Sequence, residues 1–282
     1  MFADDTKSYT SLISHEDNCK LQSDINNMDS WTYEWLLFFN KEKCKCMHLG
    51  KNNLNHVYTI GRGSEARTLD VTHVEKDLGV YIDPLLKFDF HISEVVKKCK
   101  RICSTIMKSI SYKTKDIMLP LFKSLVRPVA EYANIVWSPY LKKDISSIEN
   151  NQRHYTKRIK GMRDLSYQER LLRLKLPSLQ YRRFRGDLIE TYKLLNNFYD
   201  PVSSNLLELM PESSSTRSHN FKLKKKPFNS NQFKYFYSNR IVNVWNKLPF
   251  NIVNAATLNN FKNAIDCHFK HLIYETNFEI YY

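Results

Sequence analysis

The spacing of hydrophobic residues changes about a third of the way along the chain, and the change predicts two kinds of structure. In the first part, short alternating runs predict strands at 44–49, 57–60 and 78–82. After Pro84, apolar residues recur every three or four positions over 88–110, which predicts an amphipathic helix. The pattern therefore predicts an α+β fold, in which a partial sheet is followed by helices.

Local signals extend this prediction along the rest of the chain. A short strand at the start would turn at Asp4-Asp5 and return through Lys7 to Leu12. The pair Ser14-x-x-Asp17 resembles a capping box and predicts a helix with apolar residues at positions 21, 25, 28 and 35. Further helices are expected at 114–126, 129–137, 141–160, 166–175, 178–199, 235–247 and 257–273.

These elements divide the chain into four segments. Residues 1–83 hold the predicted strands and one helix, and residues 84–199 are almost entirely helical. Residues 200–234 contain runs of serine and lysine with few apolar residues, which is typical of a linker. A small, basic helical module is expected over 235–282.

Net charge adds a prediction about the binding partner. The 282 residues include 43 Lys and Arg against 29 Asp and Glu, a formal charge of +14. Residues 97–127 hold nine basic residues against one acid, whereas residues 1–40 hold two against seven. Such an excess favours a polyanionic partner, nucleic acid first and a membrane surface second. A merely solubilising charge is the simpler alternative.

Composition also argues against several classes of protein. Six glycines are few for Gly-rich nucleotide loops, and six cysteines in a chain of this length do not indicate a disulfide framework. No apolar run reaches the roughly 18 residues of a membrane span, and no secretory signal is recognisable. We therefore expect an intracellular protein of the nucleus or cytoplasm, without a membrane partner.

Basic residues form three rows on the predicted helices, and each row is a candidate phosphate-binding site. A row of this kind neutralises phosphates largely without regard to base sequence. The three rows are Lys97, Lys98, Lys100 and Arg101; Arg153, Lys157, Arg158 and Lys160; and Arg182, Arg183 and Arg185.

The N-terminus carries two adjacent carboxylates in the sequence Phe2-Ala3-Asp4-Asp5. Nucleotidyl transfer uses rigidly held carboxylates, because two metal ions must clamp the attacking and leaving oxygens. Alone, an Asp-Asp pair more often marks a solvated turn. Cys44, Cys46 and His48 alternate along a strand, but a structural zinc site needs four ligands, so buried cysteines are the better interpretation.

The order of motifs along nearly the whole chain resembles the reverse transcriptases of jockey-like non-LTR retrotransposons, from their second palm half onward. The matching segments are Phe2-Ala3-Asp4-Asp5, Trp31 with Trp35, Asn40-x-x-Lys43-Cys44, Asp77-Leu78-Gly79-Val80, Leu125-Val126-Arg127-Pro128, Glu131-Tyr132-Ala133, Val136-Trp137-Ser138-Pro139, Ile148-Glu149 to Gln152-Arg153, Leu165-Ser166-Tyr167-x-Glu169-Arg170-Leu171, Arg182-Arg183-x-Arg185-Gly186-Asp187-Leu188, Phe236 to Arg240, Val244-Trp245-Asn246-x-Leu248-Pro249 and Phe261-Lys262. Ala130 and His154-Tyr155 are minor departures.

The resemblance implies roles for particular residues. Asp4 would be a ligand of Mg²⁺ and Asp5 its weaker companion, while Lys43 would donate a proton to the pyrophosphate leaving group. A solvated surface lysine is the equally weighted alternative for Lys43. Gly79 would lie in the strand that holds the primer end. The implied partners are an RNA template, a DNA primer or duplex, and deoxynucleotides.

The resemblance begins late in the palm, and this limits what it implies. In the family, a first aspartate-bearing strand and a Gly-rich substrate segment precede the Phe-Ala-Asp-Asp strand, and neither is found in this sequence. We therefore expect a fragment of an RNA-directed DNA polymerase that is inactive alone. The alternative is a non-catalytic nucleic-acid-binding remnant or domesticated protein, and a membrane-surface protein is a weaker third.

Overall fold

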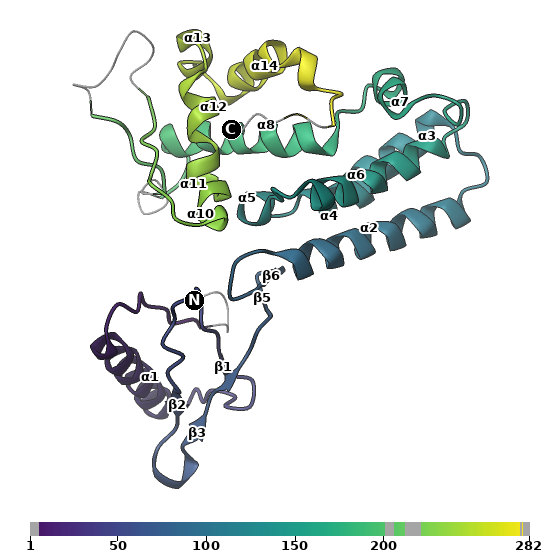
Figure 1. The fold of residues 1–282 in the computed structure, drawn as a ribbon. Coiled ribbons are helices and arrows are strands. Elements are labelled where there is room, and N and C mark those ends of the chain that lie inside the picture. The colour runs from purple at the N-terminus through teal and green to yellow at the C-terminus, as the bar shows by residue number, and fades with distance from the viewer. Residues whose placement is uncertain (1–5, 201–205, 212–220, 277, 279–282) are drawn as a thin grey trace. The chain divides into compact units, whose positions relative to one another are not determined.

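A computed structural model of the chain describes residues 6–200, 206–211, 221–276 and 278, and these form a mixed helix and sheet structure (Figure 1). The protein is 54% helical and 6% strand, which confirms the α+β expectation at the level of fold class. It divides into two compact units, Met1–Lys87 and Phe88–Tyr282. We call these unit 1 and unit 2 and describe each by itself.

Unit 1 combines one long helix with three short ladders. Helix α1 (His15–Trp35) begins at the expected box, where the Ser14 N–H donates to the Asp17 carboxylate at 2.8 Å. The ladders are β1 (Lys45–Cys46) parallel with β4 (Asp70–Val71), β2 (Thr59–Ile60) antiparallel with β3 (Arg67–Thr68), and β5 (Glu75–Asp77) antiparallel with β6 (Val80–Ile82); η1 (Gly63–Glu65) joins β2 to β3.

The predicted strand over residues 7–12 is wrong. None of the described residues 6–12 is in a strand, and no described segment pairs with their backbone. A strand exists only where a neighbour accepts and donates its backbone hydrogen bonds, so an apolar pattern alone does not create one. The expected turn at Asp4-Asp5 lies outside the described residues.

The hairpin of β5 and β6 has a tight two-residue turn. Leu78 and Gly79 at its tip have φ of 44° and 88°, and Asp77 pairs with Val80. Positive φ at both central residues matches the right-handed twist of the strands, and glycine adopts it without strain. The Lys7 ammonium also contacts the Asp77 carboxylate, so this hairpin anchors the start of the described chain.

Unit 2 is helical. Although the expected helix at 129–137 is interrupted at Tyr132 and Ala133 and the one at 235–247 is divided into three short helices, most elements of this unit fall within the expected ranges. They are α2 (Asp89–Ser109), α3 (Lys115–Leu121), the π-helical η2 (Phe122–Val126), α4 (Arg127–Glu131), α5 (Asn134–Trp137), α6 (Lys142–Lys157), α7 (Tyr167–Leu174), α8 (Leu179–Leu195), α10 (Asn231–Tyr235), α11 (Tyr237–Arg240), α12 (Val242–Asn246), α13 (Phe250–Val253), α14 (Leu258–His268) and η4 (Lys270–Leu272). The apolar periodicity thus predicted most of these helices correctly.

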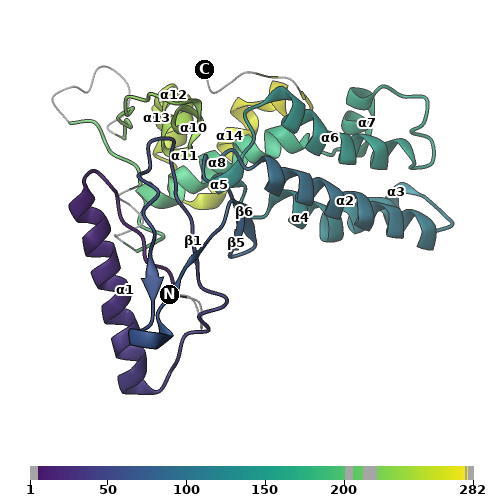
Figure 2. The same ribbon diagram turned by 60° about the horizontal axis from the view of Figure 1, so that its bottom comes forward.

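The centre of unit 2 is α8, which packs against helices that lie far away in the sequence. Its Phe184 and Leu188 share one hydrophobic cluster with Trp245 of α12 and Phe261 of α14. Leu223, from the predicted linker, is 1% exposed in the same cluster. The C-terminal helices therefore complete a core that begins with α8, and the views from two directions show them stacked on it (Figures 1 and 2).

Candidate nucleic-acid interface

Helices α2 and α6 run side by side in the same direction, and Figure 2 shows them with α4 in one layer. At their N-terminal ends, the Lys143 ammonium lies 3.9 Å from the Asp89 carboxylate. Beyond their C-terminal ends, the Lys160 N–H donates to the Lys113 carbonyl at 2.8 Å. Helix α2 buries an apolar stripe in unit 2, whereas α6 buries Ile148 and Tyr155 together with polar residues; on both helices the basic rows are exposed.

The first basic row lies on α2 with all four side chains exposed, as the amphipathic pattern predicted. Lys97 forms an ion pair with Glu94, one turn earlier, at 2.7 Å. No carboxylate of the described chain lies within ion-pair distance of Lys98, Lys100 or Arg101. Their positive charges are therefore available to an external anion.

The second row lies at the end of α6 and is also exposed: Arg153, Lys157, Arg158 and Lys160. The Arg153 guanidinium lies 4.9 Å from the centre of the Tyr167 ring. Burial raises the pKa of the Cys103 thiol on α2 to about 11, and the charge of Arg158 partly opposes this rise. Arg158 is therefore close to α2, and the two rows lie on helices that pack against each other.

We call these eight side chains the α2/α6 basic face: Lys97, Lys98, Lys100, Arg101, Arg153, Lys157, Arg158 and Lys160. Surface helices always carry some charge, so exposure alone does not make a binding site. This face is distinguished by its lack of neutralising acids. Among the described residues, Glu94 is the only acid that forms an ion pair with it, and the pair is with Lys97. Adjacent like charges repel one another, and a bound anion relieves that repulsion.

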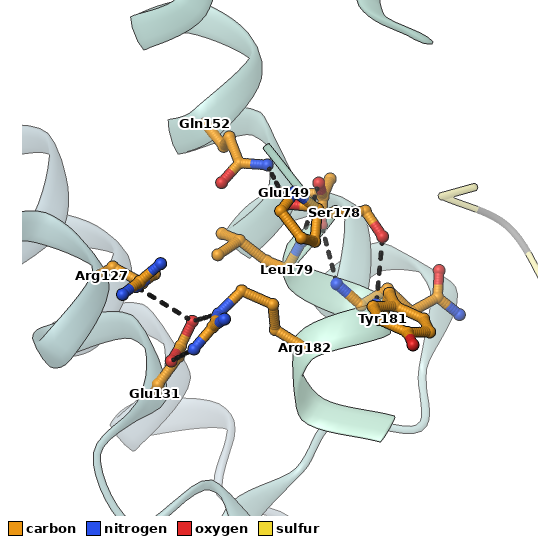
Figure 3. A network of polar contacts seen from close by, with 10 residues as sticks. Arg127, Glu131, Glu149, Gln152, Ser178, Leu179, Tyr181 and Arg182 are labelled. Atoms are coloured by element: carbon orange, nitrogen blue, oxygen red, sulfur yellow. Dashed lines mark hydrogen bonds and ion pairs between the residues drawn. The ribbon is translucent and has the colours of Figure 1, made fainter. Parts of the chain in front are cut away.

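The third expected row does not face outward. Arg182 binds the Glu131 carboxylate of α4 through two nitrogens, one of them at 2.7 Å, as Figure 3 shows. Arg185 binds Asp266 of α14 at 2.6 and 2.8 Å, and Arg183 is 3% exposed. Helix α8 is surrounded by other helices, so charges on any of its sides meet protein rather than solvent. These arginines hold the helices of unit 2 together.

Two further carboxylates of this centre were not singled out from the sequence. Asp187 forms a buried pair with Arg240 of α11 at 2.8 and 2.9 Å. Glu149 of α6 accepts from the Leu179 and Gln180 N–H groups at the start of α8, at 3.2 and 3.1 Å. Burial raises the pKa of Glu149, and the hydroxyl of Tyr167, 2.5 Å away, works in the opposite direction.

A signal for these contacts was present in the sequence. The α8 segment carries charged or large apolar side chains on every side of the helix rather than along one stripe. A helix with no solvent-facing polar side is typical of the centre of a helical domain. Its arginines and aspartate then need partners of opposite charge, because a buried charge without one is costly.

The palm-type residues of unit 1 are only partly described. Asp4 and Asp5 lie outside the described residues. Lys43 is exposed in a turn, where its N–H donates to the Asn40 carbonyl at 3.0 Å, and Gly79 is exposed at the hairpin tip. Within the described ranges, no group of three or more His, Cys, Asp or Glu side chains is arranged to hold a metal ion.

Cys46 of β1 and Cys44, which lies just before this strand, are partly buried thiols. Burial raises the pKa of both Cys44 and Cys46. The Cys46 sulfur lies 3.9 Å from Nε2 of His48, which brings together two potential ligands. Two ligands do not make a structural zinc site, which takes four.

Comparison with known proteins adds little to this geometry. No protein-family model matches the chain, and no solved structure matches it. The chain is 24% identical over 126 residues to an uncharacterized protein of Caenorhabditis elegans, B0403.1. The match covers 44% of this chain and 64% of that protein. None of the described helices has the length and apolarity that crossing a membrane requires.

Proposed function

We propose that this chain is the C-terminal part of the RNA-directed DNA polymerase of a non-LTR retrotransposon, and that unit 2 binds the phosphate backbone of a nucleic-acid duplex. The resemblance of the ordered motifs, from Phe2-Ala3-Asp4-Asp5 to Phe261-Lys262, supports the family. The observation that carries the binding proposal is the α2/α6 basic face, eight exposed cations with a single carboxylate partner.

Binding of this kind depends steeply on salt and weakly on sequence. Each phosphate that a lysine or arginine neutralises releases a condensed counterion into solution. If six of the eight residues contact phosphates, log K should fall with log salt with a slope of about −5.

The same proposal assigns no polymerase activity to the chain by itself. In the parent enzyme, Asp4 and Asp5 would hold Mg²⁺, which would supply positive charge to stabilise phosphoryl transfer. Two-metal catalysis draws carboxylates from two palm strands, and the resemblance assigns Asp4 and Asp5 to one of them. Lys43 would protonate the leaving group, but only where the nucleotide is held in place.

The binding test compares two triple variants of the full chain. Fluorescence anisotropy with a labelled RNA–DNA duplex of about 20 base pairs, spanning about 50 to 200 mM salt, gives affinity and slope. Lys97→Glu, Lys98→Glu and Arg101→Glu together should weaken binding at least about 30-fold and flatten the slope. Lys20→Glu, Lys51→Glu and Lys87→Glu, the same charge change on exposed residues of unit 1, should have a much smaller effect.

Two outcomes would contradict the proposal. Equal losses in both triple variants would mean that net charge, and not the α2/α6 basic face, binds the duplex. Tighter binding to anionic vesicles than to the duplex would favour a membrane-surface protein. Extension of a primed RNA template with magnesium, abolished by Asp4→Ala, would show that the chain is an active polymerase rather than an inactive fragment.

A further inference from the structure

The predicted linker contains a run of lysines whose backbone is held in place. We call residues 222–226 the lysine segment, because four of these five residues are lysines. Leu223 forms an antiparallel bridge with Leu209, and the Lys224 N–H donates to the Glu208 carbonyl at 2.7 Å. Figure 1 shows the two paired segments at the left end of unit 2, where the second leads into α10.

Two asparagines hold the other edge of the lysine segment. The Asn246 side chain of α12 accepts from the Leu223 N–H at 2.8 Å and donates to the Leu223 carbonyl at 2.9 Å. The Asn239 side chain of α11 accepts from the Lys226 N–H at 3.1 Å. The lysines therefore extend from a fixed backbone, and ordering costs less when a backbone is already fixed before a partner binds.

Positive charge dominates this part of the chain. Residues 221–240 hold six basic residues and no acid. Glu208 pairs with Lys224 at 2.7 Å, and the pKa of its carboxyl is lowered by that hydrogen bond and by the charge of Lys226. No carboxylate of the described residues lies within ion-pair distance of Lys225 or Lys226. These unneutralised charges favour a polyanionic partner.

An exposed aromatic ring lies beside these charges. The Lys225 ammonium is 5.8 Å from the centre of the Phe228 ring, and the Phe228 side chain is 39% exposed. Surfaces that bind single-stranded nucleic acid combine such cations, which contact phosphates, with rings on which bases stack. The bases of a duplex are already stacked and paired, so an exposed ring favours a single strand. A membrane surface is usually bound by an amphipathic helix, which this segment does not form.

The lysine segment is separate from the α2/α6 basic face. In both views it lies at one end of unit 2, whereas the C-terminal ends of α2 and α6 lie at the other end, next to α7 (Figures 1 and 2). A change in one surface can therefore be tested without altering the other.

We propose that the lysine segment and Phe228 form a second nucleic-acid site of unit 2, which binds a single strand in preference to a duplex. Lys225 and Lys226 contact phosphates, and the Phe228 ring stacks on a base. This site rests on the proposed binding of nucleic acid by unit 2 and adds to it a different form of nucleic acid.

The first test compares two ligands, a labelled thymine single strand of about 15 nucleotides and the RNA–DNA duplex, by fluorescence anisotropy with the full chain. Lys225→Glu with Lys226→Glu should weaken single-strand binding at least about tenfold and duplex binding less than about twofold. The triple charge reversal on the α2/α6 basic face should weaken duplex binding more than single-strand binding. Arg173→Glu with Lys270→Glu, the same charge change on exposed residues of α7 and η4, is the control and should change neither.

The second test separates stacking from phosphate contacts. An abasic strand of the same length keeps the phosphates and lacks the bases, so the wild type should bind it about tenfold more weakly than the thymine strand. Phe228→Ala should remove this difference, because it weakens binding of the thymine strand and leaves binding of the abasic strand unchanged. Phe228→Trp should restore the difference.

Four outcomes would overturn the second site. They are equal losses in the two double variants, equal losses of single strand and duplex in Lys225→Glu with Lys226→Glu, equal wild-type affinity for the thymine and abasic strands, and tighter binding to phosphatidylserine vesicles than to the single strand. If the triple variant keeps its affinity for the duplex while Lys225→Glu with Lys226→Glu loses the single strand, the α2/α6 basic face fails and the second site is supported.

Discussion

The two units of this protein differ in what holds them together. Of the described hydrophobic residues that are buried, Tyr58, Ile60 and Val80 belong to unit 1 and 36 belong to unit 2. Unit 2 surrounds α8 with helices and pairs its buried charges. Unit 1 relies on short ladders, turns and exposed ion pairs. Since apolar burial is the dominant favourable term in folding, unit 2 should carry most of the stability.

Replacing one tryptophan in each unit with alanine tests this difference in stability most directly. Trp245 is fully buried and donates through Nε1 to the Phe221 carbonyl at 2.8 Å, whereas Trp31 is 48% exposed. Trp245→Ala should cost about 3–5 kcal/mol of unfolding free energy, because it removes a large side chain and leaves a cavity. Trp31→Ala should cost less than about 0.5 kcal/mol.

Urea unfolding of both tryptophan variants measures these two costs. A loss at Trp31 as large as that at Trp245 would mean that unit 1 has a core of its own around α1.

Removing one partner of an ion pair gives the second contrast. The pair of Asp187 and Arg240 in unit 2 is 1% and 4% exposed, while Glu75 and Lys45 in unit 1 are both 45% exposed. Asp187→Ala should cost about 3 kcal/mol, because the Arg240 charge stays buried without its carboxylate. Glu75→Ala should cost about 0–1 kcal/mol, since water and salt screen an exposed pair.

Urea midpoints of these two variants test the contrast. A double variant, Asp187→Leu with Arg240→Met, is the control, because it removes the buried charge as well as its partner. The double variant should regain much of the unfolding free energy that Asp187→Ala loses. If it is as unstable as Asp187→Ala, the loss comes from packing and not from the unpaired charge.

The smallest expected effect is a difference in pH dependence between two carboxylates. Hydrogen bonds from the Ser14 and Ile13 N–H groups lower the pKa of exposed Asp17 in unit 1 below its ordinary 3.8, whereas burial raises the pKa of Glu149 in unit 2 above its ordinary 4.5. Ionised Asp17 therefore stabilises its unit above pH 3.8, and this contribution is lost as the pH falls through its lowered pKa. Ionised Glu149 carries a burial cost that is relieved as the pH falls through its raised pKa.

The free energy of unfolding of the wild type, measured relative to each neutral variant, should then change with pH in opposite directions for the two sites. As pH falls, the wild type should lose its advantage over Asp17→Asn and improve relative to Glu149→Gln. Denaturant unfolding at a series of acidic pH values, followed by amide hydrogen exchange in each unit, gives both slopes. Slopes of the same sign would mean that Glu149 is not shielded from water.

How far the sequence could predict the site depended on which side of a helix was involved. On α2, apolar residues at steps of three and four predicted both the helix and the outward position of Lys97, Lys98 and Arg101. On α8, the same kind of basic spacing predicted an outward row, and Arg182, Arg183 and Arg185 turned inward instead. Spacing places a side chain on a side of its helix, but only the neighbouring helices decide whether that side meets water.

The sequence by itself determined the local structure of this protein: the amphipathic helices of unit 2, the capping box at Ser14, and the excess of positive charge. Those features depend on residues a few positions apart, and hydrogen bonding and apolar periodicity act at that range. The tertiary structure decided the rest. It paired charged residues of α8 with oppositely charged partners 51 to 81 residues away and left the tryptophans of α1 exposed. Contacts at such separations depend on how whole elements pack, which no local pattern encodes.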